Sequence, residues 1–222
     1  MNCRTNAFVL GFLALLASPL PAAAETYKVV RDFSYLNPGG VWSYGSGDTG
    51  RSFTLVPSIT DGCGTPGGRT DCFRVGNAIV YINTSGNAFA DPGSGTVLVG
   101  DNVLMLHPAD GVDAIVRFRA PRAGTYTFKG SYAIMDTSPT GIAPKIFVGA
   151  TDVTKAAFGS KIDVALTGPG AVLAKKKPGG SKAFTFTRTL KAGQPVYFGV
   201  NALGNWLFDS TALKLEVRIG DP

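Results

Sequence analysis

The sequence predicts an all-β fold, a single β-sandwich with long loops rich in glycine and proline. Short runs of β-prone residues alternate with turn residues at the intervals typical of a sandwich. The 222 residues include 29 glycines and 14 prolines, whereas charged residues make up only 16%. Hydrophobic residues at 45% and aromatic residues at 10% exclude a disordered chain. The glycines lack a three-residue period, which excludes collagen, and the heptad pattern of a coiled coil is missing.

Residues 1–24 have the features of a secretory signal peptide. Arg4 supplies a positive charge, residues 7–16 form an apolar run, and Ala22–Ala24 resemble a small-residue cleavage site. The apolar run has about half of the roughly 20 residues that a membrane-spanning helix needs. We therefore expect residues 25–222 to form one exported domain, periplasmic or secreted, without a membrane span.

The first half of this domain contains several short runs with strand character. Residues 37–40 and Gly76-Asn77 provide turns, the second of them typical of a β-hairpin. Residues 57–71 form a long insertion, and residues 88–101 form a glycine-rich loop around the β-prone run 96–99. The expected strands between these connections are residues 27–34, 41–44, 51–56, 73–82 and 103–107.

The second half of the domain has the clearest strand patterns. Residues 114–119 alternate apolar and basic side chains with a period of two, as a half-buried antiparallel strand does. A turn at residues 120–124 leads into residues 125–132, which alternate in the same way. Helical periodicity is almost absent, although residues 152–158 could form one or two turns, and no repeat or linker divides the domain. The remaining expected strands are residues 145–148, 183–190, 196–200 and 213–219.

Two cysteines remain when Cys3 leaves with the signal peptide. Cys63 and Cys72 lie in a region rich in glycine and proline, allow one pairing, and are expected to form a disulfide in an exported protein. A disulfide that closes so short a loop would stabilise the fold by roughly 2–3 kcal/mol in the loop-entropy model. The alternative, a metal site, lacks a second cysteine or histidine cluster nearby in the sequence.

Seven short stretches follow one another in a recognisable order across residues 30–219. They are Asp32–Ser34, Asn37–Gly45, Leu106–Pro108, Val116–Tyr126, Thr189–Gly193, Gly204–Asn205 and Asp209–Leu213. In this order they resemble a family of secreted bacterial jelly-roll domains, which are similar to carbohydrate-binding or galactose-binding-like sandwiches. The resemblance implies an exported jelly-roll-type sandwich of two antiparallel sheets that binds a glycan.

The chain also departs from this family. Ala109 and Ala212 stand where the family often has glycine, and residues 159–181 are longer and more basic than the family leads us to expect. The sorting segment that often follows the domain in relatives is not matched by residues 218–222, so the resemblance does not imply surface sorting.

Asn205, Trp206 and Asp209 form the strongest candidate for a ligand site. A carbohydrate binder needs a flat aromatic face that stacks on the C–H surface of a sugar, with polar groups beside it to fix orientation. Trp206 could supply that face from a loop, with Asn205 and Asp209 as its polar neighbours. Trp42 and Tyr44 lie two residues apart, so on a strand they share one face and could add a second aromatic surface. The alternative for all three aromatic residues is a place in the hydrophobic core.

No residue is assigned to catalysis. His107, the only histidine, follows an apolar run, so we expect a hydrogen-bonded structural residue at a strand end, with a general base or a metal ligand as the alternatives. The chain has no Gly-x-Ser-x-Gly motif, and no motif marks a pair among its 15 carboxylates for glycoside hydrolysis.

No cofactor is expected, with a structural calcium ion as the alternative. Asp110 and Asp113 flank a turn whose spacing suits either a simple turn or a cation site, because calcium prefers carboxylate and carbonyl oxygens. Asp32 and Asp209 could form a second pair if the first and last strands are neighbours. No Asp-x-Asp-x-Asp loop supports either site.

The charge of the chain indicates no strongly acidic partner. Loss of Arg4 with the signal peptide lowers the formal net charge from +6 to +5, and basic residues are not interleaved with aromatics, so a nucleic-acid partner is not expected. Lys175–Lys177 could contact an anionic polymer or form a solvated loop. Asn83–Ser85 matches a glycosylation acceptor, which we expect to stay unmodified in a bacterial protein.

Three functions are compatible with these features. We expect an exported, non-catalytic module that recognises a polysaccharide or another glycan through loop aromatics. The alternatives are a structural or adhesive envelope protein without a small-ligand site, and a glycosidase or lyase on a jelly-roll scaffold.

Overall fold

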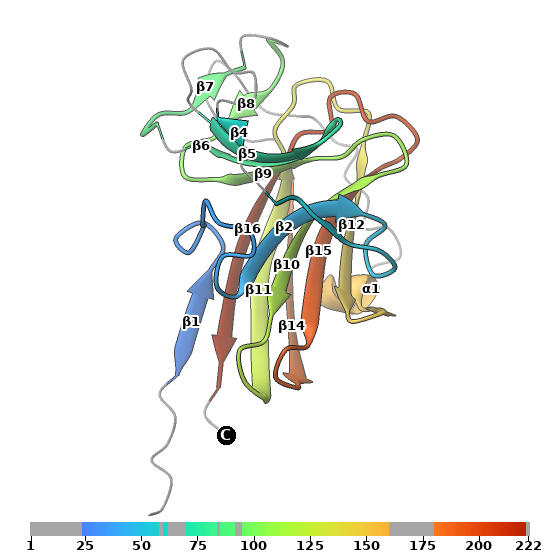
Figure 1. Cartoon of the computed structure of the whole chain (residues 1–222). Coiled ribbons are helices and arrows are strands. Elements are labelled where there is room, and N and C mark those ends of the chain that lie inside the picture. Colours follow the sequence, from blue (N-terminus) through green and yellow to red (C-terminus); the bar gives the residue numbers. More distant parts are fainter. Residues whose placement is uncertain are drawn as a thin grey trace, which may run out of the picture.

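A computed structural model describes residues 24–57, 60–61, 70–83, 85–91, 95–159 and 180–220 (Figure 1). Three features expected from the sequence lie outside these ranges: the signal peptide up to residue 23, Cys63, and Lys175–Lys177. The cleavage site, the disulfide and the basic patch therefore stay predictions. Within the described ranges, no helix is both long and apolar enough to cross a bilayer.

The fold is a jelly-roll-type β-sandwich of two large antiparallel sheets, as the sequence analysis predicted (Figure 1). The eight-stranded sheet has the order β14 (Ser181–Leu190), β11 (Gly124–Ile134), β16 (Thr211–Ile219), β9 (Leu104–His107), β6 (Ala78–Asn83), β5 (Thr70–Val75) and β4 (Thr60–Asp61), with β1 (Glu25–Lys28) paired to β16. The six-stranded sheet has the order β13 (Thr151–Asp152), β12 (Ile142–Val148), β15 (Pro195–Ala202), β10 (Asp113–Arg119), β2 (Trp42–Gly47) and β3 (Thr54–Leu55). A hairpin of β7 (Phe89–Ala90) and β8 (Leu98–Val99) and the short helix α1 (Thr154–Ala157) complete the described elements.

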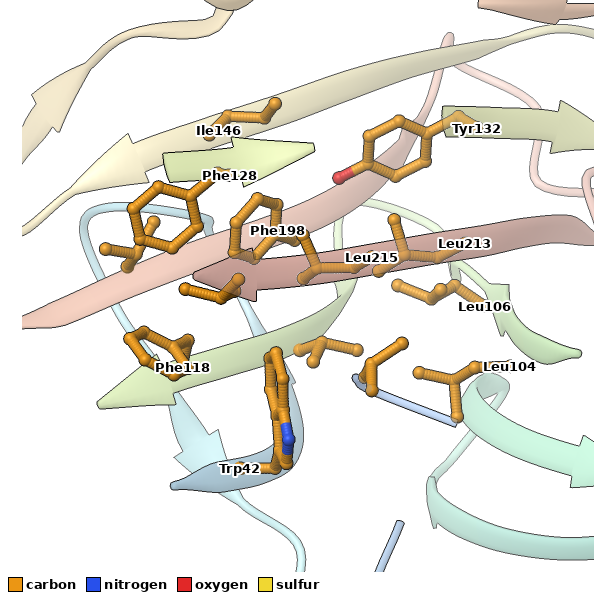
Figure 2. Close-up of a cluster of buried hydrophobic side chains, with 14 of the residues drawn as sticks. Trp42, Leu104, Leu106, Phe118, Phe128, Tyr132, Ile146, Phe198, Leu213 and Leu215 are labelled. Carbon is orange, nitrogen blue, oxygen red and sulfur yellow. The ribbon is translucent and has the colours of Figure 1, made fainter. Parts of the chain in front are cut away.

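Alternation along the long strands builds the core between the two sheets. On β11, Tyr126, Phe128 and Tyr132 are buried, whereas Thr125, Thr127 and Lys129 on the other strand face are exposed. Phe128 stacks on a phenylalanine of β14 with ring centroids 4.7 Å apart. Figure 2 shows aromatic and aliphatic side chains from both sheets meeting in this layer. Each such side chain, when fully buried, contributes about 1.5–3 kcal/mol of hydrophobic stabilisation.

Trp42 and Tyr44, which the sequence suggested as ligand-binding residues, lie in this core. Both side chains are 0% exposed. Trp42 packs edge to face against Phe118 at 5.2 Å, and Tyr44 stacks on Phe73 at 4.9 Å. Because β2 pairs with the central strand β10, the face that the two residues share is turned toward the opposite sheet. The predicted ligand contact of these two residues was therefore wrong, and the core alternative is correct.

The eight-stranded sheet is buried on its outer face as well, over β5, β6 and β9. The side chains opposite to the main core form a second apolar cluster of Cys72, Tyr81, Val97, Leu98, Val99, Met105, Ala133, Met135 and Ala212. The β7–β8 hairpin contributes the cover, and a hydrogen bond of 2.7 Å from the Leu98 N–H to the Met135 carbonyl attaches it to the end of β11. The outer face is exposed farther along β11, at Thr125 and Thr127.

The strands agree with the sequence prediction over most of the described chain, with two clear errors. The predicted strand 51–56 is reduced to the two residues of β3. The predicted strand 27–34 is half as long, because β1 ends at Lys28 and the chain then turns. The Asp32 N–H donates to the Lys28 carbonyl at 2.9 Å, and the Asp32 carboxylate accepts the Lys28 N–H at 2.7 Å, which closes this turn. The predicted hairpin turn at Gly76 and the helical turn within residues 152–158 are confirmed.

Asp113 lies in a buried polar network rather than in a cation site. Its Oδ2 atom accepts hydrogen bonds from the N–H and the hydroxyl of Thr49, at 2.9 and 2.6 Å, and from Lys145 Nζ at 2.9 Å. Its Oδ1 atom accepts from the amide of Asn201 at 2.6 Å, while Asp110 is exposed. Among the residues described, no group of three or more His, Cys, Asp or Glu side chains is placed to hold a metal ion.

Gly130 is required where β11 passes between its two neighbours. A Cβ atom there would overlap the carbonyl oxygen of Lys214 on β16 and the ring of Phe184 on β14. We expect Gly130→Ala to lower the free energy of unfolding by about 1–3 kcal/mol, measured by urea denaturation. Gly180→Ala is the matched control, since a Cβ at Gly180 has no neighbour within 4 Å. Equal losses in the two variants would contradict the packing explanation.

Candidate functional site

A cavity of about 260 Å³ lies on the outer face of the eight-stranded sheet. It is enclosed between the segment of the β7–β8 hairpin and the loop of residues 203–210, which connects β15 to β16; both lie at the upper end of the view in Figure 1. Its lining residues are Thr70, Ile79, Tyr81, Asp91, Val97, Val99, His107, Asp136, Trp206, Leu207, Phe208 and Ser210.

The strand register places the polar groups of the cavity floor. Ile79 on β6 lies opposite His107 on β9, and both point away from the main core because their neighbours in sequence point into it. The Tyr81 hydroxyl donates to Ser210 Oγ at 3.5 Å, and Ser210 Oγ is 3.2 Å from His107 Nδ1. These contacts join a side chain of β6, one of β9 and one of the residue before β16 into one chain of hydrogen-bonding groups.

His107 is uncharged at neutral pH. Burial, with a smaller contribution from the positive charge of Arg74, lowers the pKa of its imidazole from 6.5 to about 4. The residue ends β9 and hydrogen-bonds to Ser210, as the sequence analysis expected of a structural histidine. It also lines the cavity, which the sequence analysis did not foresee.

The loop of residues 203–210 presents apolar side chains at the cavity. Trp206 is partly exposed and contacts His107 edge to face, with ring centroids 5.8 Å apart and an interplanar angle of 83°. Leu207 and Phe208 also line the cavity, yet remain 44% and 39% exposed. Large apolar side chains exposed together beside a cavity are typical of a binding surface.

Thr140 holds this loop in place from the connection between β11 and β12. Its Oγ1 atom lies 2.7 Å from the Asn205 carbonyl, 2.8 Å from the Leu207 carbonyl and 3.0 Å from Asp209 Oδ1. Asp209 Oδ1 also accepts the N–H of Gly141 at 3.0 Å. The side-chain oxygen of Asn205 accepts the Leu207 N–H at 3.0 Å, which shapes the turn around Trp206.

Asp209 is therefore an anchor of the loop rather than a polar neighbour of Trp206 at the surface. Its side chain is 0% exposed and it does not line the cavity, so the predicted ligand contact is corrected. Its Oδ2 atom is buried without a hydrogen-bond partner, and burial raises the pKa of the carboxyl to about 6. Asp32, suggested from the sequence as its neighbour, instead pairs with Arg31.

Phe208 has a backbone conformation that is rare for its residue type. Its φ of 66° lies in the left-handed region, where a bulky side chain is strained. Such strain costs of order 1–3 kcal/mol and is concentrated at ligand-binding and switch segments. Here the strained residue is the one that brings a phenyl ring to the cavity rim.

Two carboxylates contribute to the wall of the cavity. Asp136 is 0% exposed, and its two oxygens accept hydrogen bonds from the Ser138 N–H at 3.0 Å and the Thr96 hydroxyl at 3.2 Å. Burial raises the pKa of this carboxyl. Asp91 lies on the other side of the same hairpin segment, where its N–H donates to the Val97 carbonyl at 2.8 Å.

The structure thus places Trp206 at a cavity, so its ligand contact stays a prediction, and most of the polar residues around it were not predicted from the sequence. Asn205 and Asp209 shape the loop, whereas Tyr81, Asp136 and Ser210 provide the polar wall. The available signal was the alternation of β6 and β9, whose outward positions carry an apolar residue, a tyrosine and a histidine instead of charges.

Comparisons with known proteins identify no family. No protein-family model and no curated protein match the chain. Among solved structures, it is similar to an isomalto-dextranase of Arthrobacter globiformis T6 complexed with panose, with 14% identity, a TM-score of 0.31 and 88% of this chain covered. The chain spans about a third of that protein, 32% of its length.

Two further solved structures align with most of this chain and over most of their own length. The K2 adhesin domain of Lys-gingipain has 16% identity and a TM-score of 0.36, over 89% of this chain and 100% of that one. A CBM4 structure has 18% identity and a TM-score of 0.28, over 73% of this chain and 90% of that one. At these low identities and TM-scores, the similar structures give no information about the site. The family suggested by the seven sequence stretches therefore stays a prediction.

Asp209 predicts a pH dependence of stability. Because its pKa is raised from 3.8 to about 6 in the folded protein, the charged form destabilises the fold. This destabilisation is absent below the pKa of 3.8 of the unfolded chain and increases as the pH rises from there to about 6. Above about pH 6 it is complete. We expect Asp209→Asn, which keeps an acceptor for Gly141, to raise the Tm near neutral pH and to change it little near pH 4. An equal change at both pH values would contradict this assignment.

The left-handed backbone conformation of Phe208 predicts an unusual order of stability among variants at this position. Phe208→Ala removes the ring but keeps a Cβ in the left-handed region, whereas Phe208→Gly removes the strain too. We expect the glycine variant to be more stable than the alanine variant by about 0.5–1 kcal/mol, measured by urea denaturation. The reverse order, which is usual at positions with negative φ, would show that Phe208 is not strained.

Proposed function

We propose that this protein is an exported, non-catalytic module that binds a glycan in the cavity beside Trp206. The observation that carries the proposal is a partly exposed tryptophan at an apolar cavity whose floor holds a tyrosine hydroxyl, a serine hydroxyl and a neutral imidazole. In the same proposal the chain is secreted or periplasmic, and Cys72, fully buried on β5, pairs with Cys63.

The chemistry of the lining suits a sugar. A sugar ring presents apolar C–H faces and polar hydroxyls, so it needs an aromatic surface together with donors and acceptors that fix its orientation. Trp206 and Phe208 offer the aromatic surface, while Ser210 and His107 can exchange hydrogen bonds with hydroxyl groups. The volume of about 260 Å³ lies just below the range of about 300–1,000 Å³ typical of small-molecule sites, which favours one sugar unit of a chain.

The arrangement supports binding more than hydrolysis. Glycoside hydrolysis uses two carboxyl groups, one on each side of the scissile bond, as acid and as base or nucleophile. The lining holds two carboxyl groups, but both oxygens of Asp136 accept hydrogen bonds from this chain itself. Asp91 and Asp136 both flank Val97 of the hairpin segment, so they belong to one wall and do not face each other across the cavity. A structural or adhesive role without a ligand remains the alternative that the following experiment distinguishes.

Trp206→Ala tests the proposal. The chain has two tryptophans, and since Trp42 is fully buried, a change in tryptophan fluorescence on adding oligosaccharides reports on Trp206. We expect a panel of neutral, amino and acidic oligosaccharides to contain a ligand that changes this fluorescence and binds in calorimetry. Trp206→Ala should weaken the calorimetric binding about tenfold, the equivalent of about 1.4 kcal/mol, because the sugar loses its aromatic contact surface. The buried Trp42 reports an intact fold.

Leu203→Ala is the matched control for this experiment. Leu203 is 50% exposed on the same loop but does not line the cavity, so its truncation should leave binding unchanged. Release of reducing ends would point to an enzyme instead. Absence of binding across the whole panel would overturn the proposal and favour the structural alternative.

A further inference from the structure

Among the described residues, the charged side chains that line the cavity are all acidic. Asp136 and Asp91 belong to its wall, whereas no lysine or arginine belongs to it among the described residues. His107, the one basic side chain in the lining, is neutral at pH 7 because burial lowers its pKa to about 4. Arg74 lies near His107, but it is exposed, does not line the cavity, and donates from Nε to the Gly76 carbonyl at 2.6 Å.

Asp136 is the carboxylate with the clearest influence on a ligand. Its hydrogen bonds come from the neutral donors Ser138 and Thr96, so they offset only part of its desolvation and supply no positive charge. The side chain is 0% exposed, and a charge in so dry a setting acts on the cavity over several ångströms with little screening.

The aromatic lining reinforces this polarity. Rings of Trp206, Tyr81 and Phe208 line the same cavity. The faces of aromatic rings carry partial negative charge and attract an ammonium group within about 6 Å, most strongly for tryptophan. Carboxylates and aromatic faces therefore favour the same sign of ligand charge.

We propose that the cavity prefers a cationic ligand, namely a glycan unit with a free, protonated amino group, over neutral or acidic sugars. This inference rests on the proposed glycan binding and adds the class of sugar. The ammonium group occupies the side of the cavity nearest to Asp136 and Asp91, and the C–H face of the ring lies against Trp206. A uronic acid in the same place brings its carboxylate toward two others and is excluded.

Calorimetric titration of the full chain with matched oligosaccharides tests the preference. We use glucosamine, N-acetylglucosamine and galacturonate oligomers of one length at about pH 6.5, where an amine resembling an α-amino group is protonated. We expect glucosamine oligomers to bind at least about tenfold more tightly than N-acetylglucosamine oligomers, and galacturonate oligomers to bind most weakly.

Two amide variants connect this preference to the wall. Asp136→Asn keeps an acceptor for Ser138, and Asp91→Asn serves if the first variant folds poorly; either should reduce the glucosamine preference to about threefold or less. Asp152→Asn is the matched control, since it makes the same charge change on β13 of the other sheet. A preference unchanged in both wall variants, or reduced equally by the control, would overturn the inference.

The failure of the inference differs from the failure of the proposed function. Equal affinity for glucosamine and N-acetylglucosamine oligomers, lost in Trp206→Ala, would leave glycan binding intact and remove the preference for an amine. If no oligosaccharide binds, both proposals fall together.

Discussion

The burial of both faces of the eight-stranded sheet at β5, β6 and β9 is the constraint on which the rest of the structure depends. A sandwich sheet needs cover on one face, and β2 and β10 provide it here. The outer face at this end carries Ile79, Tyr81 and Met105, which are too apolar to face water. The β7–β8 hairpin and the loop of residues 203–210 therefore pack over this part of the outer face. The cavity is the part of this face that the two covers leave open.

The loop of residues 203–210 carries buried anchors and cavity-lining side chains at neighbouring positions. Asp209 turns inward to Gly141, and the loop carbonyls meet the Thr140 hydroxyl, which fixes the path of the backbone. Trp206 and Phe208, between these attachments, face the cavity, and Phe208 adopts a strained conformation there. A buried carboxylate and a strained backbone both cost stability, and natural proteins accept such costs where a site requires a fixed geometry.

The fold could be predicted from the sequence to a larger extent than the site. Alternation in residues 114–119 and 125–132 is a local signal, and the strands there are those expected. The turn at Asp32 was missed because it depends on a side chain accepting the Lys28 N–H, which a strand-like pattern conceals. Trp42 is buried because its side chain points from β2 into the core between the two sheets, whereas Trp206 lies on a loop outside this core. His107 and Ser210 come together only through the pairing of strands distant in sequence, and Asp136 reaches the same cavity through its bridge to Val97, which no spacing in the chain reveals.

The antiparallel pairing of β1 with β16 sets Glu25 beside Ile219, at the far end of β16 from the loop that carries Trp206. Nine residues of β16 at about 3.3 Å each separate the two regions by about 30 Å. A surface or a second domain attached at Glu25 or Ile219 would therefore lie far from the opening of the cavity. For a module that binds a repetitive glycan as proposed, copies joined in this way would present their cavities in one direction, and multivalent attachment would need no change in the individual site.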